Sequence, residues 1–144
     1  MTGKYKRILL KISGEVLAGE EGKGINFDVA NEICSVIKEC VDMGTQLGLV
    51  VGGGNFWRGR SADSAMDRTK ADQIGMLATV MNAIYLADAF RQQGTKAVIQ
   101  TPIVFGTMTE LFSKDSALAH LENGEVLIFA AGLGTRLKPI TDTI

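Results

Sequence analysis

Three consecutive glycines, Gly52, Gly53 and Gly54, directly follow the apolar run at residues 47–51. Because glycine has no Cβ, the backbone N–H groups of such a turn can converge on an anion without steric obstruction. The alternative is a tight turn from a strand into a helix, for which one glycine would suffice, and each further glycine costs up to about 1 kcal/mol through its flexibility. The triple glycine therefore predicts a phosphate-binding turn.

Two cationic side chains lie close to glycine turns. Lys11 interrupts an otherwise apolar run just before Ser13 and Gly14, and Arg58 follows the triple glycine by four residues. Taken alone, Lys11 fits a solvated strand end equally well, and Arg58 fits a surface position in a charged loop. Phosphoryl transfer requires cations that converge on phosphate, so the two residues together favour that chemistry.

Other catalytic and ligand-binding patterns find little support. The sequence contains neither a Walker A loop nor a GxGxxG fingerprint after a strand. His120 is the only histidine, which argues against Ser-His-Asp catalysis, and we expect it at a helix end, where the helix dipole favours it. Cys34 and Cys40 show no CxxC motif, so we expect two small apolar side chains and no metal or redox site. Asp72 fits either a helix start or an acceptor of hydrogen bonds from ligand hydroxyls, and the residues alone favour the helix start.

The elements that must position these residues alternate between strands and helices. Apolar runs predict strands at residues 7–12, 47–51, 95–100 and 126–131. Apolar side chains at helical spacing predict helices at residues 28–43, 71–90 and 113–121. The glycine-rich and charged residues 19–26 predict a surface loop. Asp28 is the expected N-cap of the first helix, and Gly44 is expected to end that helix in the left-handed conformation.

Apolar strands separated by amphipathic helices predict an α/β fold with three layers, a mainly parallel sheet between helices on both faces. In such sheets, ligands bind beyond the carboxyl ends of the strands. Three of the four predicted strands end in glycine-bearing turns, at residues 13–14, 52–54 and 132–134. We therefore place the candidate site where these three turns meet.

The bulk composition limits the partners of the chain. Its 144 residues suit one domain, and its 15 basic and 16 acidic residues give a net charge of −1. This balance gives no electrostatic reason to expect nucleic acid or an anionic membrane as a partner. The first ten residues lack the long apolar stretch of a signal peptide, and no run reaches the roughly 18 consecutive apolar residues of a membrane span. We expect a cytoplasmic protein.

Three segments resemble bacterial UMP kinases, which are members of the amino-acid kinase superfamily. Residues 5–15, YKRILLKISGE, are similar to the opening of these enzymes. Residues 52–59, GGGNFWRG, resemble their second glycine loop, and residues 71–82, ADQIGMLATVMN, are similar to their long helix. The resemblance runs from about residue 5 to residue 132, and the shared order of three motifs makes it specific.

The resemblance implies an amino-acid kinase fold and phosphoryl transfer from MgATP to UMP, which gives UDP. It implies that the ATP phosphates are bound by Lys11, Ile12, Ser13, Gly14, Gly54 and Arg58. Within this set, it gives Lys11 and Arg58 the catalytic roles. It assigns Gly53, Asp72 and Gly134 to UMP, which reverses the helix-start interpretation of Asp72. It assigns no residue to a metal.

The resemblance also implies partners beyond the two substrates. Many family members receive GTP as an allosteric activator in a region that matches the loop of Gly19, Glu20, Glu21, Gly22, Lys23 and Gly24. Members are typically hexamers in which the long helix packs between subunits. The predicted helix at residues 71–90 carries more apolar surface than one sheet face covers, so we expect at least a dimer through it.

The resemblance to UMP kinases ends near residue 132. Residues 130–141, AAGLGTRLKPIT, resemble instead the signature that opens sugar-phosphate nucleotidyltransferases. We therefore expect the N-terminal part of a UMP kinase domain over residues 1–132 and a foreign or divergent tail over residues 133–144, in a truncated form of the fold. The alternative to an active kinase is a catalytically inactive nucleotide-binding or assembly module.

Overall fold

The computed structural model describes residues 5–58 and 65–133. The elements in chain order are β1 (Arg7–Ile12), α1 (Gly14–Ala18), the 3₁₀ helix η1 (Gly19–Glu21), α2 (Phe27–Asp42), β2 (Gln46–Val51), α3 (Arg68–Gln92), β3 (Ala97–Thr101), β4 (Glu110–Leu111), α4 (Lys114–Glu122) and β5 (Val126–Phe129). All four predicted strands and all three predicted helices are present.

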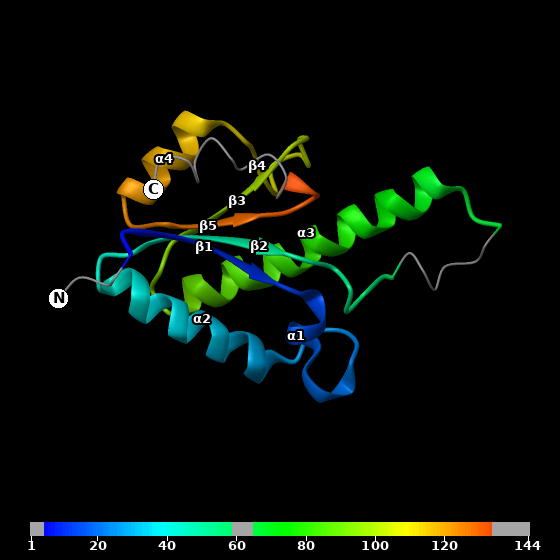
Figure 1. The fold of residues 1–144 in the computed structure, drawn as a ribbon, viewed down its shortest axis with the longest axis horizontal. Helices are drawn as coiled ribbons and strands as arrows, with labels where there is room; N and C mark the ends of the chain where they lie inside the picture. The colour runs from blue at the N-terminus through cyan, green and yellow to red at the C-terminus, as the bar shows by residue number, and fades with distance from the viewer. Residues whose placement is uncertain (1–4, 59–64, 134–144) are drawn as a thin grey trace.

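The five strands form one sheet in the order β1-β2-β5-β3-β4, and every pair is parallel (Figure 1). The last strand in the chain, β5, lies between β2 and β3, so that Ile128 has Leu49 on one side and Ile99 on the other. All residues of β5 are buried, as expected for an apolar run covered on both faces. The predicted α/β fold is confirmed. The strand β4 was missed because two residues carry no periodic signal.

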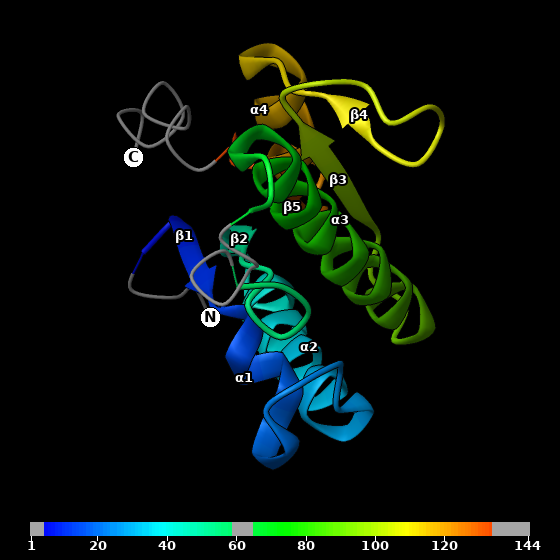
Figure 2. The ribbon, with the colours of Figure 1, turned by 90° about the vertical axis from the view of Figure 1, so that its right-hand side faces the viewer.

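Helices cover both faces of the sheet, which confirms the three layers (Figures 1 and 2). On one face, α2 and α3 contribute Ile37 and Leu86 to the main cluster of buried side chains. On the other face, α4 packs Leu121 against Phe129 of β5 in a smaller cluster. The central strands are therefore buried between helices, and their carboxyl ends open at one edge of the sheet.

The bounds of α2 follow from its capping residues. The side chain of Asn26 accepts a hydrogen bond from the Val29 N–H at 3.1 Å, so Asn26 is the N-cap and the prediction of Asp28 was wrong. Asp28 lies in the first turn, where a carboxylate interacts favourably with the helix dipole. Both are cap-forming residue types, and the sequence alone did not distinguish them. Gly44 has a φ of +95° just past the helix end, as predicted.

The segment before α2 contains more helix than predicted. The short helix α1 directly follows β1, and η1 occupies the start of the expected loop. Five and three residues are too few to show helical periodicity in the sequence. Gly22 and Gly24 have φ values of +75° and +68°, a conformation that glycine adopts without steric cost. This segment brings the chain back to the turn that follows β2.

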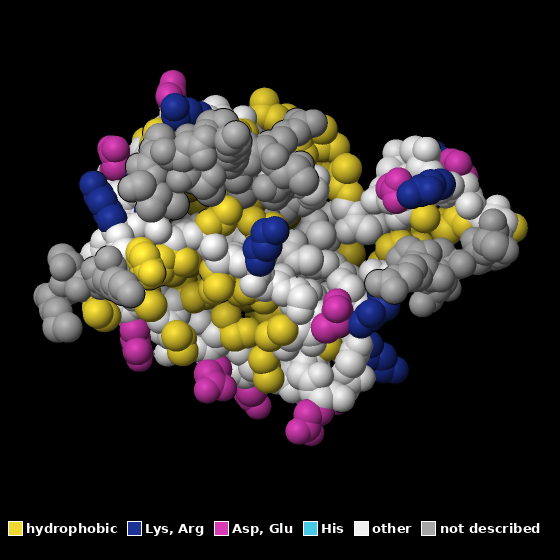
Figure 3. All heavy atoms as spheres, viewed as in Figure 1, with side chains coloured by type: hydrophobic (Ala, Val, Ile, Leu, Met, Phe, Trp, Pro, Cys, Tyr) yellow, Lys and Arg dark blue, Asp and Glu magenta, His cyan; other side chains and the backbone are white. Residues whose placement is uncertain are grey.

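The longest helix, α3, lies against the sheet with its C-terminal half and extends beyond the sheet with its N-terminal half (Figure 1). Charged side chains of both signs lie at the projecting end (Figure 3). An 18-residue window of α3 reaches a mean hydropathy of 1.2, enough to cross a membrane by length and composition, although no consecutive apolar run indicated this. Leu86 and Phe90 are fully buried in the protein core, and a core helix has the same composition.

Candidate functional site

The turns after β1 and β2 lie side by side at the carboxyl edge of the sheet. The N–H of Gly52 donates a hydrogen bond to the carbonyl oxygen of Ile12 at 2.9 Å. A Cβ placed on Gly52 would lie 3.3 Å from the backbone nitrogen of Gly14. The structure thus brings together the first two glycine turns, as expected from the parallel sheet.

Gly14 allows the closest approach between these two turns. A Cβ at this position would lie 2.6 Å from the backbone nitrogen of Gly54 and 3.0 Å from that of Asn55, and it would overlap Oδ1 of Asn55. Contacts shorter than 3.0 Å with backbone atoms cannot be relieved by rotating a side chain. Residue 14 must therefore be glycine for the two turns to keep this spacing.

The triple glycine also packs against α3. A Cβ on Gly53 would lie 2.8 Å from Cβ of Ala78 and 3.1 Å from the backbone nitrogen of Thr79. The missing side chain therefore lets the turn approach the helix backbone. Gly52 approaches the turn after β1 and Gly53 approaches α3, so more than one residue of the triple glycine makes a close contact.

A buried pair of asparagines fixes the turn after β2. The amide groups of Asn55 and Asn82 exchange two hydrogen bonds, of 3.0 Å and 2.8 Å. The amide of Asn82 also donates to the carbonyl oxygen of Gly52 at 2.7 Å. Both side chains are buried, Asn82 completely. Sequence reasoning gave neither residue a role, although a fully polar side chain within an apolar helix was an available signal.

The third turn, after β5, is held by a hydroxyl group. The N–H of Ala131 donates to Oγ1 of Thr79 at 2.7 Å, and that hydroxyl donates to the carbonyl oxygen of Met76. Ala131 has a φ of +62°, a left-handed conformation that costs a non-glycine residue roughly 1–2 kcal/mol. Thr79 therefore fixes the turn that leads to the predicted UMP loop. Gly134 and the tail beyond it lie outside the described residues.

Both predicted catalytic cations have exposed side chains. Lys11 lies in β1 next to Val50 of β2, one residue before the strand ends. Arg58 lies 3.6 Å from a carboxylate oxygen of Glu15, and about half of each of these side chains is exposed. An exposed pair at this distance contributes no more than about 1 kcal/mol, so a ligand phosphate can compete for the guanidinium.

A pocket of about 270 Å³ lies between the glycine turn and the N-terminal half of α3. It is lined by Gly53, Gly54, Trp57, Ala71, Asp72 and Gly75. The structure therefore brings Gly53 and Asp72 together, the two described residues that the resemblance assigns to UMP. Since α3 begins at Arg68, Asp72 lies beyond the first turn, so it is not a helix-start residue.

Trp57 contributes an unused donor beside this pocket. Its indole Nε1 is buried and has no hydrogen-bond partner. A Cβ added to Gly75 would lie 3.5 Å from Cδ1 of the same ring, so this side of the indole faces α3. An unpaired buried donor costs about 1–3 kcal/mol. Sequence reasoning did not single out Trp57.

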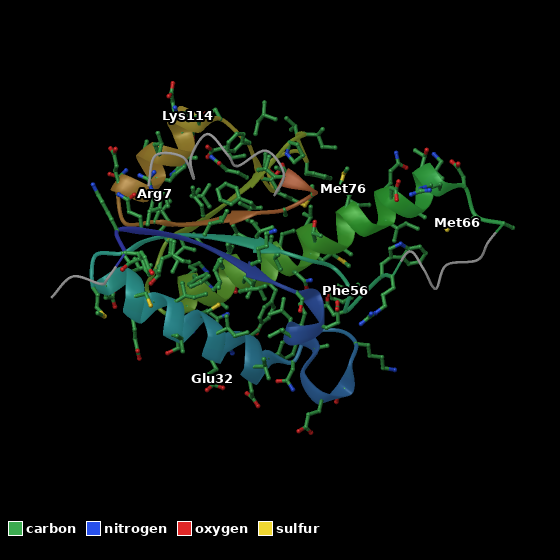
Figure 4. The ribbon with its side chains drawn as sticks, viewed as in Figure 1. Arg7, Glu32, Phe56, Met66, Met76 and Lys114 are labelled. Atoms are coloured by element: carbon green, nitrogen blue, oxygen red, sulfur yellow. The ribbon has the colours of Figure 1, made fainter. Side chains whose placement is uncertain are left out.

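A second pocket, of about 320 Å³, adjoins the first and shares Gly54 and Trp57 with it. Its remaining lining residues are Gly22, Lys23, Asn55, Phe56 and Arg58. Figure 4 shows Phe56 on the segment that follows β2, below α3. Part of the loop that the resemblance assigns to GTP thus reaches the glycine turn. A larger groove, of about 650 Å³, lies elsewhere, between the C-terminal half of α3 and β3.

His120 belongs to a separate polar cluster, which we call the Glu110 cluster and which consists of Gln100, Glu110, Ser116, His120 and Glu125. Nε2 of His120 lies 3.0 Å from Glu110, and Nδ1 lies 3.0 Å from Glu125. His120 lies in the last turn of α4, as predicted. In the described part of the chain, no group of three or more His, Cys, Asp and Glu side chains could hold a metal ion.

The pKa of Glu110 is lower than its usual value of 4.5. Burial is the largest single influence and raises the pKa, but hydrogen bonds from Ser116, Gln100 and His120, with the charge of His120, together outweigh it. The carboxylate is thus stabilised in its ionised form by groups from β3 and α4. These contacts fasten the edge strand β4 to the rest of the fold.

Comparisons with known proteins agree with this geometry. Residues 6–141 match the amino acid kinase family. A UMP kinase from Bacillus anthracis has 36% sequence identity and a TM-score of 0.83, and the match covers 90% of this chain and 54% of that one. A UMP kinase from Ureaplasma parvum has 31% identity and a TM-score of 0.82, with coverage of 91% and 58%. An isopentenyl phosphate kinase shares the fold, with 22% identity and a TM-score of 0.59. That match covers 85% of this chain and 55% of the other. The chain spans little more than half of each.

Proposed function

The chain belongs to the amino acid kinase family, and from this premise we propose that it transfers a phosphoryl group from MgATP to UMP, giving UDP. The observation that carries the proposal is the pocket that joins Gly53 and Asp72 beside the glycine turn. The identity of 31–36% to two UMP kinases supports the same acceptor. In this role, the carboxylate of Asp72 accepts hydrogen bonds from ribose hydroxyls of UMP.

The residues at the carboxyl edge suit the donor phosphates. Backbone N–H groups of the turns at residues 13–14 and 53–54 face polyphosphate oxygens, and the amide pair Asn55–Asn82 keeps the turn after β2 in place. Lys11 and Arg58 reduce the negative charge on the transferring group. Mg²⁺, when bound to ATP, supplies further neutralisation of the β and γ phosphates. The UMP phosphate is itself the nucleophile, so the site needs no strong general base.

An assay for ADP formation tests the proposal directly. With MgATP present, we expect UMP to support turnover and AMP to support little. Lys11→Ala should lower turnover on the order of a hundredfold, since one charge-stabilising contact in the transition state is worth about 3 kcal/mol. Lys114→Ala is the matched control, because Lys114 lies at the start of α4 and lines neither pocket beside the glycine turn (Figure 4). Nucleotide binding without ADP formation would instead support the inactive binding or assembly module.

We extend the proposal to the partners and location of the chain. Leu77, Met81 and Ile84 lie at helical spacing on α3 and are 40–50% exposed, which supports a dimer through this helix. Light scattering at micromolar concentration should give twice the chain mass. The free thiols of Cys34 and Cys40 fit a reducing, cytoplasmic location. Activation by GTP stays a prediction of the resemblance.

A further inference from the structure

The loop before α2 is fastened to the turn after β2 by two hydrogen bonds. The N–H of Gly24 donates to the carbonyl oxygen of Asn55 at 2.9 Å, and the amide of Asn55 donates back to the carbonyl oxygen of Gly24 at 2.8 Å. Asn55 is buried and is held from the other side by Asn82 of α3. These hydrogen bonds hold the loop at residues 22–24 against the turn after β2.

This attachment places Lys23 and Arg58 on the same pocket. The pocket of about 320 Å³ has these two cations among its lining residues and, within the described part of the chain, no carboxylate. Lys23 is exposed and forms no ion pair with any residue in the described part of the chain. Among the residues that the structure describes, the ion-pair partner of Arg58 is the half-exposed Glu15 at 3.6 Å, which is not a lining residue. The described lining residues therefore carry a net positive charge, which favours an anion.

The residues that line the pocket indicate which class of anion it binds. Gly54 presents backbone without a side chain, and Phe56 and Trp57 add aromatic surface on which a flat base can stack. Phosphate oxygens are tetrahedrally arranged and can accept from both a guanidinium and an ammonium. A nucleotide phosphate fits these features better than a lone carboxylate does, because it carries more charge and offers more acceptor oxygens.

We propose that Lys23 is a phosphate-binding residue that shares one nucleotide phosphate with Arg58. The inference rests on the proposed function, because it takes the ligand to be a substrate nucleotide. It places Lys23 at the substrate pocket. Lys23 then increases the affinity for the substrate nucleotide, whereas Lys11 stabilises the negative charge of the transferring phosphoryl group.

Calorimetric titration of the full chain tests this assignment, first with inorganic tripolyphosphate and then separately with ATP, UMP and GTP. We expect Lys23→Gln and Arg58→Gln each to weaken the binding of tripolyphosphate about fivefold, and both variants should weaken the binding of the same substrate nucleotide to a similar extent. A change of about fivefold in affinity corresponds to the contribution of one exposed charged contact, about 1 kcal/mol. Lys23→Arg should restore most of the affinity, and higher salt should reduce all the differences. Lys114→Gln is the control and should bind as the unmodified chain does, since Lys114 lies at the start of α4 and lines neither pocket beside the glycine turn (Figure 4).

The outcomes separate this inference from the proposed function. Unchanged affinity in Lys23→Gln, beside weakened affinity in Arg58→Gln, would overturn the inference. A loss confined to GTP would overturn it in favour of an effector site, and an unmodified chain that binds none of the four ligands would also overturn it. If both variants weaken tripolyphosphate binding but no ADP forms with UMP and MgATP, the shared phosphate site stands and the proposed reaction fails.

Discussion

Two polar regions of the molecule differ in how far their hydrogen-bonding groups are already used. At the glycine turns, Lys11 and Lys23 form no ion pair within the described residues, and the indole N–H of Trp57 has no partner. In the Glu110 cluster, both ring nitrogens of His120 contact carboxylates, and Glu110 also accepts from Gln100, although the buried Oε1 of Gln100 has no partner among the described residues. Unused donors beside a pocket favour ligand binding, whereas mutually paired groups favour a structural role.

The backbone at the glycine turns is nevertheless closely packed. Gly14 and Gly53 allow contacts that no side chain would permit, and the Asn55–Asn82 pair closes the turn from inside. At the glycine turns, the backbone is therefore closely packed, and the groups without partners are side-chain donors. A rigid backbone with unpaired donors is preorganised for an anion, because little needs to reorganise when the ligand arrives.

The largest effect should come from Gly14→Ala. The new Cβ would lie 2.6 Å from the backbone nitrogen of Gly54, and it would overlap Asn55. Since neither atom can move without shifting the turn, we expect the free energy of unfolding to fall by about 3 kcal/mol. Chemical denaturation followed by circular dichroism measures this change.

Gly75→Ala is the matched control for that substitution. It lies inside α3, and its new methyl group would meet Cδ1 of Trp57 at an ordinary 3.5 Å. Alanine is the better helix former, so this variant should gain about 0.5–1 kcal/mol. If Gly14→Ala were as stable as the unmodified chain, the two turns would be free to separate, and the contrast between a rigid backbone and open side chains would fail.

An intermediate effect is expected from Asn82→Asp. The aspartate keeps the shape of the side chain but loses the N–H group that donates to the carbonyl oxygen of Gly52 and to Asn55. A fully buried carboxylate facing a carbonyl oxygen should lower the free energy of unfolding by about 2 kcal/mol. Asn123→Asp, at the exposed end of α4, should change it by less than about 0.5 kcal/mol. Equal effects in the two variants would remove the structural role of the amide pair.

Long elements with clear periodicity were predictable from the sequence. The strands β1, β2, β3 and β5 and the helices α2 to α4 follow from apolar spacing, and the meeting of the glycine turns follows from the parallel sheet. The elements α1 and β4 were not predictable, because each is too short to show a period. Sequence reasoning also chose Asp28 over Asn26 as the cap, since both residue types cap helices.

The candidate site was predictable only in part. Glycines, cations and Asp72 stood out by residue type, and the structure places Gly53 and Asp72 on one pocket. Their supports did not stand out, because they depend on contacts between distant parts of the chain. Asn55 and Asn82 are 27 residues apart, and Thr79 and Ala131 are 52 apart. No local pattern signals such pairs.

The smallest expected effect concerns the Glu110 cluster and depends on pH. The pKa of Glu110 is lowered in the folded chain, so its ionised form stabilises the fold above its usual value of 4.5. That contribution is lost as the pH falls through the lower, folded value. Glu110→Gln should therefore reduce the melting temperature at pH 7 by roughly 4 °C, equivalent to about 1 kcal/mol. The difference from the unmodified chain should shrink toward zero as the pH falls below 4.5 and through the lower, folded value, because a protonated Glu110 is also neutral.

Melting curves recorded by circular dichroism between pH 3 and pH 8 measure this dependence. Glu122→Gln is the control, because Glu122 is exposed on the same helix as Ser116 and His120 and should give a small difference at every pH. Subtracting the melting temperature of one variant from that of the other at each pH removes the general loss of stability in acid. A difference for Glu110→Gln that stays constant across the range would mean that the carboxylate charge contributes nothing. The Glu110 cluster would then be held by packing and neutral hydrogen bonds, and its contrast with the open glycine turns would lie in burial instead of charge pairing.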